Sequence, residues 1–403
     1  MPFPSSVGRR AARVIADEFI RHPGPKTGLI MGAAPGHPVL SAAVDALLPG
    51  DRLTVVIDAT HRDAYDTYLA DQGAWVRDRV SLVTTPADAA PADVVMLAEP
   101  AAGESAEFAK TAATLRELVT AGGVVTLAVP RWSAAADDVA ELATEFGIGT
   151  DLVLRNRPPL RIHRLRFGTA PDGIVDTVAP THRPSSVPLT SRMHIDSNGV
   201  AAGAIMLGLA AVTKRVRPRS KLWLLPAVAA APVAAFFRDP QRHTDDDTNS
   251  VVASGDGKVL SVERVNDDRF GTDNTDWLRI AVFLSVFDVH VNRSPVGGTV
   301  VDVFREEGGF APAMKAAAEH NVACYTVLDT PHGRVAVAQR TGLVARRIVN
   351  RALPGSIVAK GERFGLIRFG SRTDVYLPAD TADAVVAPGE RVVAGETVIA
   401  RWR

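Results

Sequence analysis

Cysteine is almost absent from this chain. Its 403 residues include one cysteine, Cys324, so an internal disulfide is excluded, and so is a zinc site built from cysteines. A single thiol fits a reducing compartment. We therefore predict no disulfide framework and no metal centre.

The chain also lacks an excess of either charge. It has 45 basic and 45 acidic residues and only 6% aromatics, with no basic stripe interleaved with aromatic side chains. Proteins that bind nucleic acid normally show such a stripe, so no nucleic-acid partner is expected. Residues 1–19 lack the apolar core of a signal peptide, which predicts a cytosolic start.

The N-terminal half alternates between strand-like and helix-like segments. Such alternation predicts a parallel α/β sheet, and we assign residues 1–180 to a Rossmann-like domain. A helical stretch is expected around 105–120, and residues 152–168 are expected to add edge strands. The predicted strands lie within residues 28–34, 52–60, 79–85, 93–100 and 122–130.

A polar, proline-rich stretch at 179–192 separates this half from the rest, so we predict a linker at 181–195. From residue 250 onward the chain is rich in strand-forming residues, and residues 354–367 weakly repeat as 388–400. This pattern predicts a β-rich α+β domain over 196–403 with barrel or sandwich character.

Two apolar segments, 200–212 and 222–237, flank a bridge at 213–221 with five basic residues. Neither reaches the about 20 apolar residues that span a bilayer. One interpretation is a pair of buried core helices, which the residues alone slightly favour. The other is a hairpin lying in the membrane interface, with the bridge against anionic headgroups.

Three short segments carry residues suited to catalysis. Asp256 lies in ASGDGKV (253–259), His290 in FLSVFDVHVNRSPVGG (283–298), and Gly370-Ser371 in RFGSRTDVYLP (368–378). Each alone fits an ordinary turn or a structural histidine. Their combination is more specific than any one of them.

Together with FFRDPQR (236–242) and GLVARRIV (342–349), these segments resemble the phosphatidylserine decarboxylase family in order and spacing over residues 196–403. Gly-Ser-Arg at 370–372 is similar to the shorter branch of that family. The resemblance implies a self-processing, pyruvoyl-dependent enzyme. It would convert phosphatidylserine into phosphatidylethanolamine and carbon dioxide.

The resemblance also implies a role for each residue. Asp256 orients His290, which deprotonates Ser371, and the Ser371 hydroxyl attacks the carbonyl carbon of Gly370. Acyl shift and β-elimination then leave a pyruvoyl group, giving a β chain to residue 370 and an α chain of residues 371–403. The pyruvoyl carbonyl forms a Schiff base with the substrate amine and takes up the electrons that decarboxylation releases.

Other assignments stay open. Arg293, Arg238 and Arg372 are the candidates for holding the lipid phosphate. Some members of the family that this chain resembles carry a histidine three positions before the one matching His290, and it is assigned to the decarboxylation step. Here that position is Phe287, so the residue that protonates Cα is unassigned. Gly355-Ser356 is a rival cleavage site by composition (354–357), which we discount because it falls at a repeated Pro-Gly turn.

A lipid substrate shifts the preference for the apolar pair towards membrane contact, over residues 198–240. We then expect a peripheral protein on the cytoplasmic face of the cell membrane, in contact with anionic lipid. The sequence also allows a homo-oligomer. Two alternatives remain: a non-enzymatic lipid-binding relic that anchors the N-terminal domain, and a decarboxylase of another serine-containing substrate.

The N-terminal half resembles a class I S-adenosylmethionine-dependent methyltransferase domain. In that family a glycine-rich loop and an acidic residue hold the cofactor, and Gly32, Gly36 and Asp58 match these positions. The loop departs from the usual pattern, because its glycines are four apart with Pro35 between them. We therefore prefer a degenerate Rossmann-like scaffold to a working methyltransferase.

Overall fold

The computed structural model describes residues 7–101, 105–171, 173–181, 186–271, 276–343, 347–368 and 370–403. They belong to two compact units, Met1–Pro184 with Leu353–Ile357, and Ser185–Ala352 with Val358–Arg403. The division falls inside the predicted linker 181–195. The linker prediction is wrong from residue 186 onward, because β8 (Ser186–Pro188) and β9 (Met193–Asp196) pair with each other there.

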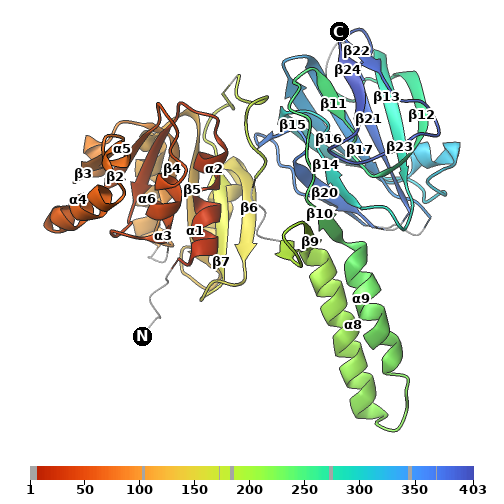
Figure 1. The fold of residues 1–403 in the computed structure, drawn as a ribbon, viewed down its shortest axis with the longest axis horizontal. Coiled ribbons are helices and arrows are strands. Elements are labelled where there is room, and N and C mark those ends of the chain that lie inside the picture. Colours follow the sequence, from red (N-terminus) through yellow and green to blue (C-terminus); the bar gives the residue numbers. More distant parts are fainter. Residues whose placement is uncertain are drawn as a thin grey trace. The chain divides into compact units, whose positions relative to one another are not determined.

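The first unit contains a seven-stranded sheet in the order β3-β2-β1-β4-β5-β7-β6 (Figure 1). Strands β1 to β5 run parallel, and β7 is antiparallel to both of its neighbours. This order confirms the predicted Rossmann-like class. The strands are β1 (Thr27–Met31), β2 (Arg52–Val56), β3 (Val80–Val83), β4 (Ala92–Leu97), β5 (Val119–Pro130), β6 (Gly147–Val153) and β7 (Leu160–Leu165).

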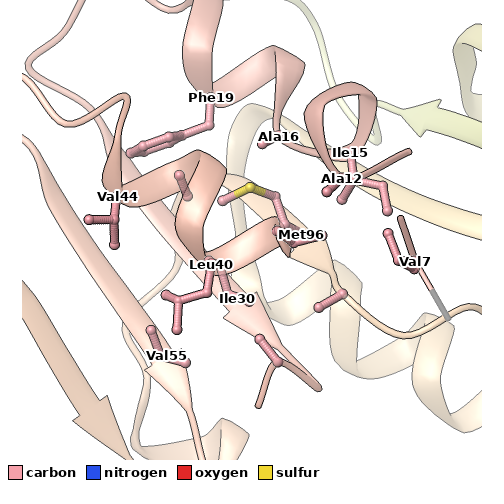
Figure 2. Close-up of a cluster of buried hydrophobic side chains, with 14 of the residues drawn as sticks. Val7, Ala12, Ile15, Ala16, Phe19, Ile30, Leu40, Val44, Val55 and Met96 are labelled. Carbon is pink, nitrogen blue, oxygen red and sulfur yellow. The ribbon is translucent and has the colours of Figure 1, made fainter. Parts of the chain in front are cut away.

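Helices cover both faces of this sheet, because its strands are apolar on both sides. Figure 2 shows the core on one face, where Phe19, Leu40 and Met96 pack together. Elements on this side are α1 (Arg9–Ile15), α2 (Asp17–Arg21), α3 (Pro38–Val44), η1 (Ala59–His61), α4 (Arg62–Asp71) and α5 (Ala74–Arg77). The other core lies under α6 (Ser105–Leu118) and α7 (Ala136–Phe146), and η2 (Pro86–Asp88) joins β3 to β4.

The second unit is built mainly from antiparallel strands, as predicted. A curled sheet of eight strands has the order β19-β15-β16-β17-β21-β13-β12-β23, accompanied by the three-stranded sheets β14-β20-β18 and β11-β24-β22. The strands are β10 (Arg238–Pro240), β11 (Ser250–Val252), β12 (Gly257–Asn266), β13 (Asp276–Leu284), β14 (Val291–Arg293), β15 (Gly298–Glu306), β16 (Ala323–Thr330), β17 (Gly333–Arg340), β18 (Ile348–Asn350), β19 (Ile357–Val358), β20 (Arg363–Ile367), β21 (Ser371–Pro378), β22 (Ala382–Ala384), β23 (Arg391–Val392) and β24 (Val398–Trp402), with η3 (Ala316–His320) before β16.

Strand β21 lies in the middle of the eight-stranded sheet and is buried along its whole length. Because side chains alternate across a strand, Val375 enters one core and Tyr376 enters the other. Ser371 has the parity of Val375, whereas Arg372 has the parity of Tyr376. The two neighbours therefore face opposite sides of the sheet.

The two apolar segments form a helical hairpin, α8 (Ser197–Val216) and α9 (Leu224–Phe236), which extends away from the strands of the second unit (Figure 1). Helix α8 has the length and composition of a membrane-crossing helix, and only 17% of its apolar window is buried. The prediction of buried core helices is wrong. Large apolar side chains exposed on the hairpin are Val200, Ile205, Leu207, Leu209, Val212, Val216, Leu222, Leu224, Leu225 and Val228.

Candidate active site

Ser371 is the first residue of β21 and is fully buried. It lies opposite Leu284 of β13. Its Oγ has no hydrogen-bond partner among the described residues, which is unusual for a hydroxyl that has lost all contact with water. A buried, unpaired hydroxyl is free to act as a nucleophile.

Gly370 precedes it with φ +63°, a left-handed conformation that glycine adopts without steric cost. Its carbonyl oxygen lies against the backbone of Gly342, where an added Cβ would come within 1.9 Å of it. Gly370 is thus favoured for its backbone conformation, whereas Gly342 is needed because the Gly370 carbonyl lies against it. Gly342 begins the segment GLVARRIV (342–349), and its role follows only from this contact in the folded chain.

His290 is buried just before β14. Its Nδ1 lies 2.9 Å from the carbonyl oxygen of Asp288 and donates to it, so Nε2 of the neutral ring carries the lone pair. That Nε2 is also buried without a partner in the part of the chain that the structure describes. Burial lowers the pKa of His290 to about 4, against the opposing effect of Asp288 and with a smaller contribution from Arg238. The ring is thus a neutral base at ordinary pH.

The loop that presents His290 is fixed by the side chain of Asp288. Its Oδ2 accepts hydrogen bonds from Ser285 N at 2.8 Å and Ser285 Oγ at 2.6 Å, and its Oδ1 accepts from Arg391 at 2.5 Å. The Ser-x-x-Asp spacing of 285–288 is typical of such a side-chain turn. The spacing is visible in the sequence and predicts this turn.

Packing and hydrogen bonds connect His290 to the strand of Ser371. Asn292, two residues after His290, accepts at Oδ1 from Gln339 Nε2 at 2.8 Å. Gln339 lies directly opposite Thr373, which shares a face of β21 with Ser371. His290 and Ser371 therefore belong to one stretch of interior.

This interior contains an unusual number of unpaired polar atoms. Buried polar groups are nearly always hydrogen-bonded in folded proteins, so a group of such exceptions needs an explanation. A site that receives a polar ligand or reacting group during its chemistry would supply one. The six atoms, which we call the orphan cluster, are Ser254 Oγ, His290 Nε2, Asn292 Nδ2, Gln339 Oε1, Ser371 Oγ and Thr373 Oγ1.

Asp256 does not contact His290. Its Oδ2 accepts from Arg242 Nη2 at 2.8 Å, and its Oδ1 accepts from the Ala394 backbone N–H at 2.8 Å. Burial raises the pKa of Asp256, although the Ala394 N–H and the Arg242 charge oppose the rise. The predicted orienting contact is therefore absent, and the carbonyl of Asp288 holds the imidazole instead.

The three arginines predicted as candidates for holding the lipid phosphate differ in their burial and in their hydrogen-bond partners. Arg293 is buried and donates to Gly361 O at 3.0 Å, Asp239 Oδ1 at 3.1 Å and Pro240 O at 2.9 Å, so it holds the chain together. Burial lowers the pKa of Arg293 to about 9, assisted by a nearby arginine. Arg238 donates to the carbonyl of Phe287 and carries a charge that reaches His290.

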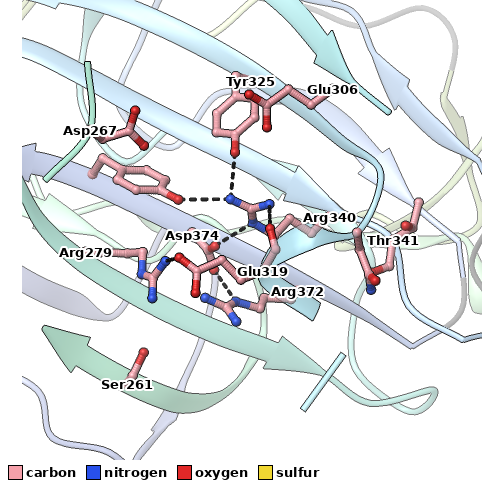
Figure 3. Close-up of polar contacts among 12 residues, drawn as sticks. Ser261, Asp267, Arg279, Glu306, Glu319, Tyr325, Arg340, Thr341, Arg372 and Asp374 are labelled. Atoms are coloured by element: carbon pink, nitrogen blue, oxygen red, sulfur yellow. Dashed lines mark hydrogen bonds and ion pairs between the residues drawn. The ribbon is translucent and has the colours of Figure 1, made fainter. Parts of the chain in front are cut away.

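Arg372 belongs to a buried ionic network on the face of β21 opposite Ser371, so the structure contradicts its predicted contact with the lipid phosphate. Arg340 donates to Asp374 at 2.8 Å and to Tyr376 Oη at 3.0 Å, while Arg372 donates to Asp374 at 2.5 Å. Figure 3 shows Arg340 and Arg372 converging on Asp374. Burial alone would raise the pKa of Asp374, but Arg340 and Arg372 outweigh it and lower that pKa. The network holds the strand that begins with Ser371.

The rival pair Gly355-Ser356 shares the left-handed glycine, with φ +83° at Gly355, but its polar atoms are bonded. Ser356 Oγ donates to Leu353 O at 2.6 Å, and the carbonyl of Gly355 accepts a hydrogen bond from Arg166. Nucleophile and carbonyl are therefore both engaged elsewhere, in contrast with those of 370–371.

In the first unit, Gly32 and Gly36 have φ of +74° and +73° in the loop between β1 and α3. Glu99, after β4, lies beside this loop, since a Cβ on Gly32 would meet its Cγ at 3.2 Å. This is the edge of a parallel sheet where ligands bind in such folds. Asp58 is exposed and accepts from Thr60 N at 2.9 Å and Thr60 Oγ1 at 2.7 Å, so it caps η1. These hydrogen bonds lower the pKa of Asp58.

Known proteins are similar to parts of this chain. A solved O-methyltransferase, TomG from Streptomyces achromogenes, is 14% identical, covers 40% of this chain and 82% of its own, and has a TM-score of 0.30. We base the Rossmann-like methyltransferase fold of the first unit on its own sheet order. A sequence model of the family described as phosphatidylserine decarboxylase matches residues 230–400.

Curated relatives agree with that match. The phosphatidylserine decarboxylase proenzyme of Carboxydothermus hydrogenoformans is 44% identical over 170 residues, which cover 42% of this chain and 79% of the relative. The proenzyme of Geobacter sulfurreducens is 43% identical over 209 residues, which cover 49% of this chain and 90% of the relative. This chain belongs to the phosphatidylserine decarboxylase family.

Proposed function

We propose that this chain is a proenzyme that cuts itself between Gly370 and Ser371 and then decarboxylates phosphatidylserine. One observation carries the assignment of the cut. Ser371 Oγ and His290 Nε2 are both buried, and neither has a hydrogen-bond partner among the described residues, while the Asn292–Gln339 hydrogen bond joins the His290 segment to the strand that pairs with β21. The proenzyme relatives support it independently.

The cut needs a base, a nucleophile and an accessible carbonyl. His290 Nε2 takes the Ser371 hydroxyl proton, and Oγ bonds to the carbonyl carbon of Gly370. The C–N bond breaks as the nitrogen of residue 371 accepts a proton, which leaves an ester. Loss of the Ser371 α-proton then expels the Gly370 carboxylate, and water replaces the nitrogen of the resulting dehydroalanine as ammonia.

The residue left at position 371 would be a pyruvoyl group. Its carbonyl supplies the electron sink that decarboxylation of an amino acid requires. The orphan cluster fits such a group, because Ser254 and Thr373 bring hydroxyls, and Asn292 and Gln339 bring amides, into an interior that excludes water. These four side chains would bind and orient polar atoms of the substrate.

A lipid substrate is supported by the exposed apolar surface of the same unit. Phe287 is 84% exposed and lies next to Asp288, which holds His290. A soluble amino acid would gain nothing from an exposed phenylalanine at this position, whereas an acyl chain or a membrane would cover it.

We further propose that the α8–α9 hairpin binds the cytoplasmic face of the cell membrane peripherally. Its exposed apolar side chains would enter the headgroup boundary, and its basic tip would meet anionic lipid. Lys214 Nζ lies 4.8 Å from the centre of the Trp223 ring, a pairing of cation and aromatic ring suited to the interface. The tip residues are Lys214, Arg215, Arg217, Arg219 and Lys221.

Intact mass of the purified chain tests the cut, and product analysis tests the reaction. We expect no 42.7 kDa species after maturation, and instead a separate α chain of residues 371–403. Phosphatidylserine vesicles should yield phosphatidylethanolamine, while soluble phosphoserine should be left unchanged. An uncut chain with an intact Ser371 would refute self-processing. Turnover of phosphoserine but not of vesicles would assign a soluble substrate instead.

A further inference from the structure

The last residues of helix α9 touch the proposed base. The ring centroid of Phe236 lies 4.2 Å from that of His290, at an interplanar angle of 41°. Phe236 is buried and clusters with Phe237 and with Leu366 of β20. The hairpin that carries the exposed apolar surface thus ends directly on the catalytic imidazole.

The first turn of helix α8 contacts the segment that precedes the scissile Gly370–Ser371 bond. Asn198 Oδ1 accepts a hydrogen bond from Arg368 Nη2 at 3.1 Å, and the Arg368 guanidinium lies 5.6 Å from the centre of the Phe237 ring. Arg368 follows β20 and precedes Gly370 by two positions. The start of the hairpin therefore holds the segment that leads into the scissile bond.

A third contact secures the same strand. Asp196, which caps α8, pairs with Arg351 Nη2 through both carboxylate oxygens at 2.9 and 2.7 Å. The Arg351 backbone N–H in turn donates to the Phe364 carbonyl of β20 at 2.8 Å. Both ends of the hairpin are anchored to the strand that runs from the hairpin base towards Ser371.

We propose that Phe236 and Asn198 are positioning residues for self-cleavage: Phe236 holds His290, and Asn198 holds the segment before Gly370 through Arg368. This rests on the proposed cut at 370–371. Neither residue touches the reacting atoms. Each limits the motion of a group that must reach Ser371 or Gly370, and misplacement of a reacting group by about 1 Å can cost on the order of 10²-fold in rate.

Phe236 also controls the charge of the base. His290 accepts a proton from Ser371 only while it is neutral, and the phenyl ring covers it against water. The charged groups around the imidazole are Asp288, which favours the protonated ring, and Arg238, which disfavours it. Without the phenyl ring, water reaches the imidazole, and its pKa rises towards the ordinary value of about 6.5.

The test uses full-length precursor made by cell-free synthesis, with the cut fraction followed by intact mass between pH 4 and 8. For Phe236→Leu we expect a cleavage rate lower by about 10-fold or more, and an acid midpoint shifted upward by roughly one pH unit or more. Phe270→Leu is the matched control, because Phe270 is equally aromatic and buried but lies in the core with Trp277. It should leave the midpoint in place.

Asn198→Ala gives an independent test that does not open a core. The Arg368 guanidinium loses its acceptor, so we expect cleavage to slow several-fold, with an unchanged pH midpoint because the base is untouched. Ser197→Ala, one residue earlier and exposed, should cut like the wild type. If circular dichroism shows that Phe236→Leu does not fold, the comparison of Asn198→Ala with Ser197→Ala alone tests the proposal.

The outcomes separate the two levels of the proposal. A wild-type chain that never cuts refutes the proposed function itself. A wild-type chain that cuts, together with folded Phe236→Leu and Asn198→Ala variants that match its rate and pH midpoint, overturns the positioning role while leaving self-cleavage intact.

Discussion

Each unit of this protein buries a histidine whose Nε2 has no hydrogen-bond partner among the described residues, yet only one of them belongs to a candidate site. His163 lies on β7 of the first unit, and His290 precedes β14 of the second. Burial lowers the pKa of both to about 4. His163 makes a contact with Thr150 Oγ1 at 3.2 Å, whereas His290 joins the orphan cluster around Ser371. One unpaired imidazole is therefore weak evidence for catalysis, and a contiguous group of unpaired atoms is stronger.

Asp58 and Ser371, the candidate site residues of the two units, also differ in burial and in hydrogen bonding. Asp58 in the first unit is exposed, and its Oδ1 already accepts two hydrogen bonds from Thr60. Ser371 in the second unit is buried, and among the described residues nothing satisfies it. A polar residue whose side chain caps its own turn has a structural reason to be there, so the second unit carries the better-supported site.

The largest expected effect follows from removing the nucleophile. Ser371→Ala should abolish cleavage completely, because alanine has no atom that can attack Gly370. Ser356→Ala is the matched control at the rival Gly-Ser pair, and it should cut at the wild-type rate. Intact mass distinguishes the two. A cut in Ser371→Ala, or its loss in Ser356→Ala, would reverse the choice between these sites.

The two histidines allow a direct comparison. His290→Gln should slow cleavage by roughly 10²- to 10⁴-fold, the usual contribution of a positioned base, while His163→Gln should leave the cleavage rate unchanged. Time courses of the cut at pH 7 measure both. Equal rates in the two variants would remove His290 from the role of base.

Both histidines should also affect stability in acid. Each has a folded-state pKa near 4, below the unfolded value of about 6.5, so the unfolded chain binds protons first as the pH falls. Stability should therefore be full above about pH 6.5 and decrease towards pH 4, and each glutamine variant should flatten part of that decrease.

Crowding of the scissile Gly370 carbonyl should reduce the cleavage rate by an intermediate amount. Gly342→Ala would place a Cβ within 1.9 Å of Gly370 O and 3.1 Å of the Ala313 Cβ, so the carbonyl must move. We expect cleavage to slow by about 10- to 100-fold. Gly208→Ala, on α8 with open space around it, should leave the cut unchanged and raise helix stability slightly. A fast cut in Gly342→Ala would show that the carbonyl does not need this packing.

The sequence blocks singled out Ser371, His290 and Gly370 as candidates, because side-chain identity and spacing are visible in the sequence. They could not show that the Asp288 carbonyl holds His290, since every residue has a carbonyl. They also could not decide whether the hairpin is buried or exposed, because apolar composition is the same for a buried helix and an exposed one. The error at Arg372 was avoidable: strand parity puts its side chain on the face opposite Ser371.

Charge at the hairpin tip gives a smaller, salt-dependent effect. Replacing Lys214, Arg215 and Arg217 by glutamine should weaken binding to anionic vesicles by about 1 kcal/mol per charge, and the loss should shrink in high salt. Arg9, Arg10 and Arg13 of α1 are exposed and offer the same charge change in the first unit. Their replacement should leave vesicle sedimentation unchanged, and equal losses in both variants would assign the binding to net charge alone.

The smallest effect is expected in the first unit. Because Asp58 already caps η1, we expect saturating S-adenosylmethionine to leave the thermal unfolding of this unit unmoved. A ligand at 100 times its Kd would instead add about 2.7 kcal/mol. Asp58→Ala should lower the unfolding temperature slightly through the lost cap, and Asp58→Asn should restore most of it, because asparagine caps equally well. A shift with S-adenosylmethionine that Asp58→Asn removes would make Asp58 a ligand residue, and the two units would then each carry a working site.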